Sequence, residues 1–167
     1  MALILVGGGA RSGKSRWALS RARQRGDRLV YIATAEALDE EMAARIVKHR
    51  AERDSAFQTI EEPLDLAGAI RSAECDAMVV DCLTLWLSNR MHASQDRTLD
   101  QTDDAISAAV AQKAEVIVVT NEVGCGIVPE NALAREFRDR AGIMNQRFAE
   151  AAAEVYWMVF GQPLRVK

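Results

Sequence analysis

Residues 2–15 read Ala-Leu-Ile-Leu-Val-Gly-Gly-Gly-Ala-Arg-Ser-Gly-Lys-Ser, and this stretch decides the fold. It places a short apolar run, typical of a buried strand, directly before the pattern G-x-x-x-x-G-K-S, and a helical pattern begins at Arg16. In this context the pattern predicts a loop that binds nucleotide phosphates, because its glycines turn successive N–H groups toward phosphate oxygens and the following helix attracts anions. The residues predicted to bind phosphate are Gly8, Gly9, Ala10, Arg11, Ser12, Gly13, Lys14 and Ser15.

Three of the polar side chains near this loop have predicted individual roles. Lys14 can reach the outer phosphates, and the Ser15 hydroxyl can bind a magnesium ion. Asp81 ends the apolar run 77–80, and an acidic residue at that place in a phosphate-loop protein is the usual magnesium partner. The alternative interpretation of Asp81 is an N-cap for the helix expected from Leu83.

Continuous apolar runs at residues 2–6, 29–33, 77–80 and 116–119 alternate with helical patterns. This alternation predicts an α/β fold of the P-loop (RecA-like) type, with a mostly parallel sheet, helices on both faces and a C-terminal antiparallel hairpin within 155–167. Residues 1–167 are expected to form a single domain. Because ligands bind at the carboxyl ends of such strands, the loop, Thr34, Asp81 and residues 120–122 should meet at one edge.

Composition excludes several classes of protein. The net charge of −3 argues against a general nucleic-acid binder, and no apolar stretch approaches the length needed to span a bilayer. The three cysteines form no C-x-x-C pair, which suits a reducing cytoplasm. We therefore expect a cytoplasmic nucleotide-binding protein.

The chain contains two histidines, His49 and His92. On a helix, His49 shares a face with Met42, Ile46 and Arg53, and nearby arginines could contact phosphate oxygens. Spacing alone favours a partly buried structural histidine over a functional one. His92 lies beside a polar break and is interpreted as structural or exposed.

A loop with two glycines and a proline, residues 121–130, follows the last strand of the parallel set. It starts at the ligand edge of the sheet, so contact with a substrate is favoured over a mere connection. The arginines of the following helix, among them Arg135, Arg138 and Arg140, could equally form a solvated or subunit-contact face.

Several segments together resemble one enzyme family. These are the phosphate loop, Tyr31-Ile32-Ala33-Thr34, residues 41–49, residues 120–131 with Asn-Glu-Val-Gly at 121–124, and Arg138-Asp139 to Gly142 with Asn145-Gln146. They resemble the bifunctional adenosylcobinamide kinase and adenosylcobinamide-phosphate guanylyltransferase of cobalamin biosynthesis. The resemblance runs nearly end to end.

The resemblance implies two reactions. A nucleoside triphosphate, ATP or GTP, phosphorylates the hydroxyl of the aminopropanol arm of adenosylcobinamide, and GTP then gives GMP to that phosphate with release of pyrophosphate. The second reaction passes through a guanylyl group on a histidine, which by the resemblance is His49. The family also implies nucleotide contacts from Ala33, Thr34, Ala35, Arg50, Ala51, Glu52, Arg53, Glu61 and Asp81. Glu62 could exchange roles with Glu61.

This chain departs from the family pattern at two places. Some relatives carry adjacent histidines where this chain has Lys48-His49, so the assignment rests on His49 alone. Position 81 is Asp where some relatives have Glu, and both can bind magnesium.

The resemblance also implies a trimeric assembly, so a homo-oligomer is expected. The alternatives are a kinase-only enzyme for another small alcohol, and a RecA-like nucleotide-dependent regulatory module.

Overall fold

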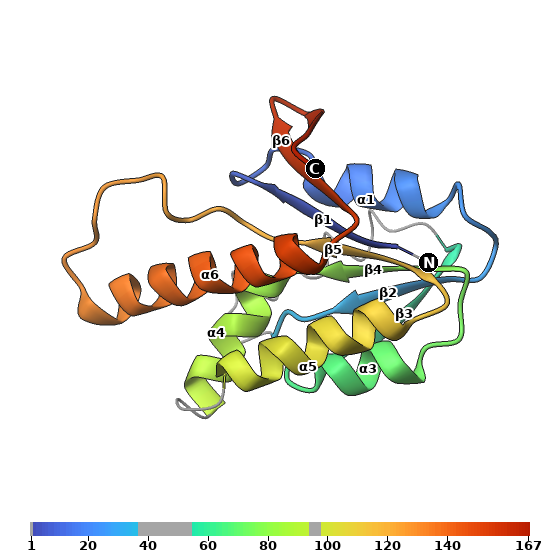
Figure 1. The fold of residues 1–167 in the computed structure, drawn as a ribbon, viewed down its shortest axis with the longest axis horizontal. Helices are drawn as coiled ribbons and strands as arrows, with labels where there is room; N and C mark the ends of the chain where they lie inside the picture. The colour runs from blue at the N-terminus through green and yellow to red at the C-terminus, as the bar shows by residue number, and fades with distance from the viewer. Residues whose placement is uncertain (1, 37–54, 94–97) are drawn as a thin grey trace.

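The computed structural model of the chain describes residues 2–36, 55–93 and 98–167. Its strands are β1 (Leu3–Gly8), β2 (Leu29–Ala33), β3 (Phe57–Glu61), β4 (Ala77–Asp81), β5 (Glu115–Val119), β6 (Glu154–Val159) and β7 (Gln162–Arg165). Its helices are α1 (Lys14–Ala22), α3 (Leu66–Ser72), α4 (Leu83–Ala93), α5 (Thr98–Ala111) and α6 (Ala132–Ala151). The predicted alternation of strands and helices is thereby confirmed (Figure 1).

The described strands form one seven-stranded sheet in the order β3-β2-β4-β5-β1-β6-β7. Each neighbouring pair is parallel except β6 and β7, which are antiparallel. The predicted C-terminal hairpin is present, and its first strand also joins the parallel set because α6 returns the chain to the starting side of the sheet. Only the terminal β7 edge is antiparallel.

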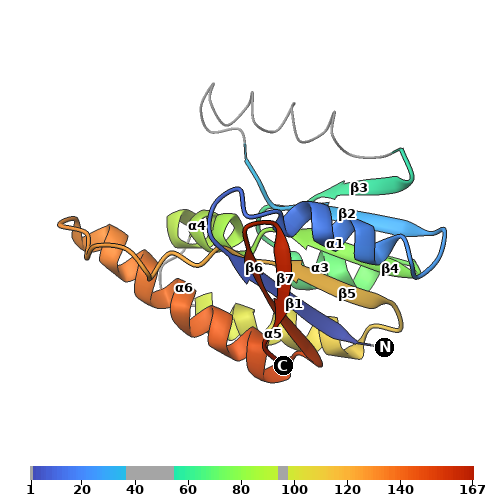
Figure 2. The same ribbon diagram turned by 90° about the horizontal axis from the view of Figure 1, so that it is seen from above.

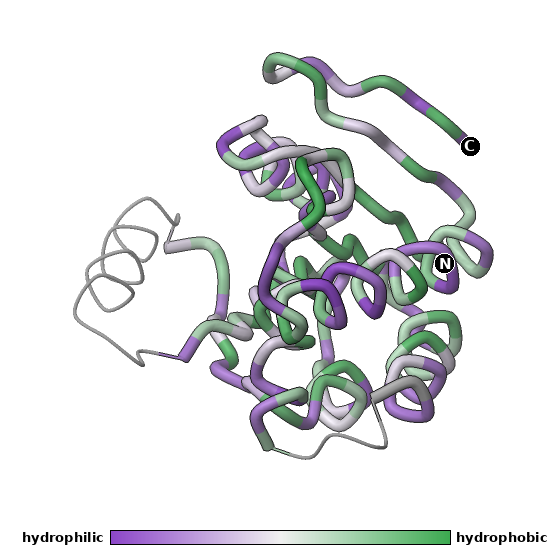
Figure 3. Tube along the Cα trace, turned by 90° about the vertical axis from the view of Figure 1, so that its left-hand side faces the viewer, coloured by the Kyte–Doolittle hydropathy of each residue, from purple (hydrophilic) through white to green (hydrophobic). Residues whose placement is uncertain are grey.

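Alternation along the strands divides the core between the two faces of the sheet. Leu3 and Leu5 pack with the layer of α3, α4, α5 and α6, whereas Ile4 and Val6 pack with α1. Both faces are therefore covered, which explains why these strands are apolar throughout (Figure 2). In Figure 3, apolar stretches coloured green run through the middle of the molecule.

Local capping shifts some helix bounds from those that the apolar pattern predicts. The sequence predicts a helix over 63–71, with Pro63 at its beginning. The helix in the structure, α3, begins instead at Leu66, because the Asp65 carboxylate accepts a hydrogen bond from Gly68 N–H at 2.9 Å and so caps it. The Glu62 carboxylate accepts hydrogen bonds from the N–H groups of Leu64 and Asp65, at 2.9 and 2.8 Å. These bonds hold residues 62–65 in a turn before the helix.

A charged cluster closes the amino edge of the sheet. The buried carboxylate of Glu115, at the start of β5, pairs with Arg21 at 3.1 Å and with Arg25 at 2.7 Å. Arg21 also pairs with Glu154 at 3.3 Å, and the Tyr156 hydroxyl donates to Glu154 at 2.6 Å. The cluster fixes the C-terminal end of α1 to β5 and β6, and so orients the helix that begins at the phosphate loop.

Within the described residues, no helix combines the length and the apolar character that crossing a membrane would require.

Candidate functional site

The phosphate loop, residues 8–15, leaves β1 and enters α1 through backbone conformations that glycine allows. Gly13 caps α1 with a left-handed φ of 92°. A Cβ on Gly8 would lie 2.9 Å from both the Met158 carbonyl oxygen and the Ser12 hydroxyl. Glycine is therefore required at both positions. At Gly13 the reason is the positive φ, and at Gly8 it is the close approach of the β6 backbone.

The Lys14 side chain lies inside this loop. It is buried, and its ammonium group donates to the Gly9 carbonyl at 2.5 Å and to the Ser12 hydroxyl at 3.4 Å. Burial lowers the pKa of Lys14, and the neighbouring Cys82 and Asp81 oppose this shift. Burial raises the pKa of the Cys82 thiol to about 11, so this thiol is neutral near pH 7.

Asp81 ends β4 on the sheet face that α1 covers. It lies beside Ala33 in the register, and two residues earlier on β2 the Tyr31 hydroxyl donates to the Asp81 carboxylate at 2.8 Å. The alternation of side chains along β2 places Tyr31 and Ala33 on the same face. Sequence reasoning missed Tyr31, because only the register shows that its hydroxyl reaches Asp81.

Thr34 connects the ends of β2 and β4. Its hydroxyl donates to the Cys82 carbonyl and accepts from the Cys82 N–H, both at 2.8 Å, while its own N–H donates to the Asp81 carbonyl at 3.2 Å. The Asn89 amide on α4 donates to the Thr34 carbonyl at 2.7 Å. The Thr34 side chain thus bonds to the protein backbone, which fixes the two strand ends relative to each other.

Hydrogen bonds extend this connection to β5 and α6. The Asn121 amide donates to the Thr84 hydroxyl at 2.8 Å, and the Thr120 hydroxyl donates to the Asn145 side-chain oxygen at 2.7 Å. The Glu122 N–H donates to the Gly8 carbonyl at 3.2 Å. The structure therefore confirms that the phosphate loop, Thr34, Asp81 and residues 120–122 meet at one edge of the sheet.

The remaining predicted nucleotide contacts fall into two groups. Ala33 is buried at the end of β2, Ala35 is half-buried just beyond it, and Glu61 lies beside Ala33 at the end of β3. His49, Arg50, Ala51, Glu52 and Arg53 lie outside the described residues. His92 is exposed, and its ring contacts the Ser88 carbonyl within α4 at 2.7 Å.

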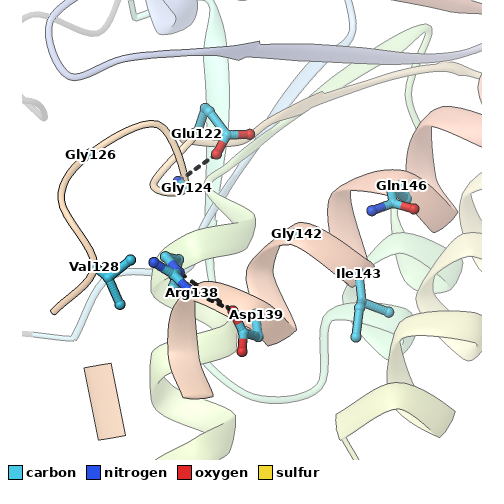
Figure 4. Close-up of a pocket in the computed structure, with 9 residues that line it drawn as sticks. All are labelled: Glu122, Gly124, Gly126, Val128, Arg138, Asp139, Gly142, Ile143 and Gln146. Carbon is cyan, nitrogen blue, oxygen red and sulfur yellow. Dashed lines mark hydrogen bonds and ion pairs between the residues drawn. The ribbon is translucent and has the colours of Figure 1, made fainter. Parts of the chain in front are cut away.

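A cavity of about 450 Å³ opens between the 121–130 loop and α6 (Figure 4). Its lining residues are Glu122, Gly124, Gly126, Val128, Arg138, Asp139, Gly142, Ile143 and Gln146. The Glu122 carboxylate accepts from Gly124 N–H at 2.5 Å, which folds the start of the loop back on itself. The loop therefore borders a hollow as well as connecting two elements.

Ser15 and Asp81, beside the phosphate loop, offer oxygen atoms of the kind that a magnesium ion binds. The half-buried Ser15 lies in the first turn of α1, and the Asp81 carboxylate is oriented by Tyr31. Magnesium prefers oxygen ligands and commonly uses one or two protein oxygens together with substrate phosphates. Within the described residues, no group of three or more His, Cys, Asp or Glu side chains is placed to hold a metal, so these residues form no complete protein cage.

Two solved structures share the fold at low sequence identity. The flagellar accessory protein FlaH from Methanocaldococcus jannaschii is similar with a TM-score of 0.55 at 15% identity, covering 99% of this chain and 78% of that one. The RadB recombinase is similar with a TM-score of 0.54 at 16% identity, covering 93% and 73% of the two chains. These likenesses confirm the predicted fold class.

Sequence comparison is more specific. A bifunctional adenosylcobalamin biosynthesis protein CobP from Pseudomonas aeruginosa is 43% identical, covering 98% of this chain and 96% of the relative. The protein CobU from Salmonella typhimurium, with the same bifunctional description, is 42% identical over 99% of both chains. A family model described as cobinamide kinase / cobinamide phosphate guanyltransferase matches residues 4–166. The chain, with its phosphate loop at the carboxyl edge of a parallel sheet, belongs to the cobinamide kinase / cobinamide phosphate guanyltransferase family.

Proposed function

We propose that this chain phosphorylates adenosylcobinamide with a nucleoside triphosphate and then transfers GMP from GTP to the product, giving adenosylcobinamide-GDP and pyrophosphate. The observation that carries the proposal is the match of the family model to residues 4–166 of this chain. The phosphate loop supports it, because its glycines have the conformations that phosphate binding needs and its lysine is buried. Both reactions need a bound triphosphate, so one loop can serve both.

In the kinase reaction, the acceptor hydroxyl attacks the γ-phosphorus and releases its proton to water. The bond from that phosphorus to the β-bridging oxygen breaks, and the nucleoside diphosphate leaves. The backbone N–H groups of the loop and the Lys14 ammonium hold the phosphates and offset the charge that develops on the leaving diphosphate. The partly enclosed position of Lys14 strengthens this interaction, because water screens it less than at an open surface.

In the guanylyl transfer, we assign the nucleophile to His49 on the family resemblance. A neutral imidazole nitrogen attacks the α-phosphorus, pyrophosphate leaves, and a nitrogen–phosphorus bond holds the GMP group. An oxygen of cobinamide phosphate then attacks the same phosphorus, and the imidazole is released as the nitrogen–phosphorus bond breaks. Lys14 and the loop hold the departing pyrophosphate.

Magnesium and the nucleotide contacts complete the proposal. Ser15 and Asp81 would hold the ion, which when bound neutralises phosphate charge. Of the two adjacent glutamates, we propose Glu61 as the nucleotide contact on the family resemblance, and it lies beside Ala33, another proposed contact, in the strand register. The further proposed nucleotide contacts are Ala33, Thr34, Ala35, Arg50, Ala51, Glu52 and Arg53.

The histidine assignment can be tested with GTP labelled at the α-phosphate. The wild type should acquire an acid-labile protein label in the absence of acceptor, and His49→Ala should acquire none. The matched control is His92→Ala, because that ring is exposed and contacts the Ser88 carbonyl of its own helix, so its loss should leave labelling unchanged. Persistent labelling of His49→Ala would overturn the assignment. An unlabelled wild type that still phosphorylates an alcohol would favour the kinase-only alternative.

Location and assembly are part of the same proposal. Free thiols at Cys75, Cys82 and Cys125 suit a reducing cytoplasm. We also propose a homo-oligomer, on the resemblance to trimeric relatives. Light scattering of the purified chain measures its mass in solution, and a monomer at micromolar concentration would contradict this part.

A further inference from the structure

We propose that the cavity between the 121–130 loop and α6 is the acceptor subsite, in which Arg138 binds the phosphate of the cobinamide phosphate arm. This inference rests on the proposed function, since it names where the acceptor of that reaction binds. The position of the cavity, the chemistry of its lining and its connection to the phosphate loop support this assignment.

The cavity lies at the correct edge of the sheet for an acceptor. It adjoins the carboxyl end of β5, the strand beside β1, and β1 leads into the phosphate loop. Glu122 belongs to both regions, because it lines the cavity while its N–H bonds to the Gly8 carbonyl at 3.2 Å. A ligand in the cavity would therefore lie beside the phosphate loop without occupying it.

The lining offers a cation suited to a phosphate. Arg138 is largely sheltered, with 22% of its side chain exposed, and it lies between α6 and the loop (Figure 4). Its contacts with its neighbour Asp139 are long, 3.4 Å from both Nε and Nη2 to the same oxygen. Strong charge-assisted bonds are about 2.7–2.9 Å, so within the described residues Arg138 is not held by a tight ion pair. A phosphate can offer it two oxygens in the matching geometry.

The rest of the lining leaves room for an extended arm. A Cβ added at Gly126 or at Gly142 would meet nothing within 4 Å, so the cavity is open over both backbones. Val128 and Ile143 supply apolar surface to the same hollow. Apolar walls with a few polar groups are typical of small-molecule sites.

Asn145 connects the cavity wall to the strand ends. Its side-chain oxygen accepts from the Thr120 hydroxyl at 2.7 Å, and its amide lies 3.4 Å from the Asn121 carbonyl. Because Asn145 lies one turn beyond Gly142 on α6, these bonds fix the helix relative to β5. The proposed acceptor subsite and the phosphate loop thus belong to one hydrogen-bonded framework, which fixes their positions relative to each other.

Two substitutions test the subsite by different means. Arg138→Gln removes the cation, and Gly142→Phe fills the open space without meeting protein atoms at its Cβ. Each should raise the dissociation constant of cobinamide phosphate, measured by equilibrium dialysis, by about tenfold or more. For Arg138→Gln this is the loss of one charge-assisted hydrogen bond, and for Gly142→Phe it is the loss of the space that the arm would occupy. Guanylyl-enzyme formation from labelled GTP without acceptor should remain at the wild-type level. The control is Arg140→Gln, a cation of the same helix that pairs with Glu136 and does not line the cavity.

The two proposals fail in different ways. If the wild type forms neither guanylyl enzyme nor product, the proposed function is wrong. If the wild type is active and both variants bind cobinamide phosphate as tightly as Arg140→Gln does, the acceptor subsite is wrong and the function stands. Loss of guanylyl-enzyme formation in folded Arg138→Gln and Gly142→Phe would also overturn the subsite, because the cavity would then belong to the nucleotide.

Discussion

Lys14 is the side chain on which both proposed reactions depend most directly. Replacing it with alanine removes the buried ammonium from the phosphate loop, and we expect both rates to fall by about a hundredfold or more. Steady-state assays of phosphorylation and of guanylyl transfer measure the effect. Lys113→Ala is the control, since this exposed lysine precedes β5 at the opposite edge of the sheet. A rate within about threefold of wild type for either reaction would contradict a shared loop.

The lowered pKa of Lys14 also predicts a dependence on pH. Because burial lowers this pKa below the usual 10.5, the ammonium loses its proton at a less alkaline pH than an exposed lysine does. The loop then loses positive charge, so the KM for the triphosphate should begin to rise at a pH below the 10.5 that is usual for an exposed lysine. In Lys14→Ala the KM should not show this rise. A wild-type KM that stays flat up to pH 10.5 would be inconsistent with a functional charge at this position.

At the level of single residues, the sequence predicted those site residues that belong to one continuous motif. Gly8, Gly13 and Lys14 follow from one signature, and the structure gives each a physical reason in φ, in close approach or in burial. Tyr31 did not follow, because its contact with Asp81 depends on the pairing of two strands 50 positions apart. His49 was assigned by family resemblance, and spacing alone favoured a structural role.

At the scale of elements, the cluster around Glu115 predicts a stability effect separate from catalysis. Glu115→Gln leaves Arg21 and Arg25 without their shared buried carboxylate, and should lower the free energy of unfolding by about 2 kcal/mol or more. Urea denaturation measures this change. The control Glu136→Gln breaks an exposed pair within α6 and should change it by less than about 0.5 kcal/mol. If the two substitutions lowered the free energy of unfolding equally, the burial of the Glu115 carboxylate would not be the reason for its contribution to stability.

Strand positions were predictable because both faces of this sheet are covered. Continuous apolar runs marked β1, β2, β4 and β5, and the structure moves their ends by only a few residues. The start of α3 was less predictable, since it depends on which carboxylate, Glu62 or Asp65, bonds to which N–H. The parallel pairing of β6 with β1 depends on the path of the whole chain between them.

At the scale of the whole molecule, binding and folding are coupled. A ligand that binds only the folded chain adds about 2.7 kcal/mol to its stability at a hundredfold excess over the dissociation constant. Magnesium-GTP should therefore raise the urea midpoint, whereas guanosine should raise it much less, because the loop binds phosphates. Urea denaturation at the same concentration of each ligand measures the two shifts of the midpoint. An equal shift from guanosine would indicate that phosphate contacts contribute little to binding.

The sequence also predicted the edge at which the site forms, since strand ends of a parallel sheet converge there. It indicated the 121–130 loop as a candidate substrate contact, but not the cavity beneath it. That hollow depends on how Asn145 sets α6 against Thr120, a contact between segments 25 residues apart. The hydrogen bonds that connect Thr84, Asn121 and Asn145 could not be predicted either, because none of these residues belongs to a sequence motif that specifies its partner.

The place of β1 in the sheet has a consequence for biosynthesis. Its two neighbours are β5 and β6, and the Met158 backbone of β6 lies against Gly8. During synthesis β1 is therefore made more than 100 residues before β5, and it acquires its second partner only once residues 154–159 have followed. A nascent polypeptide would carry the complete nucleotide signature long before it could retain a nucleotide.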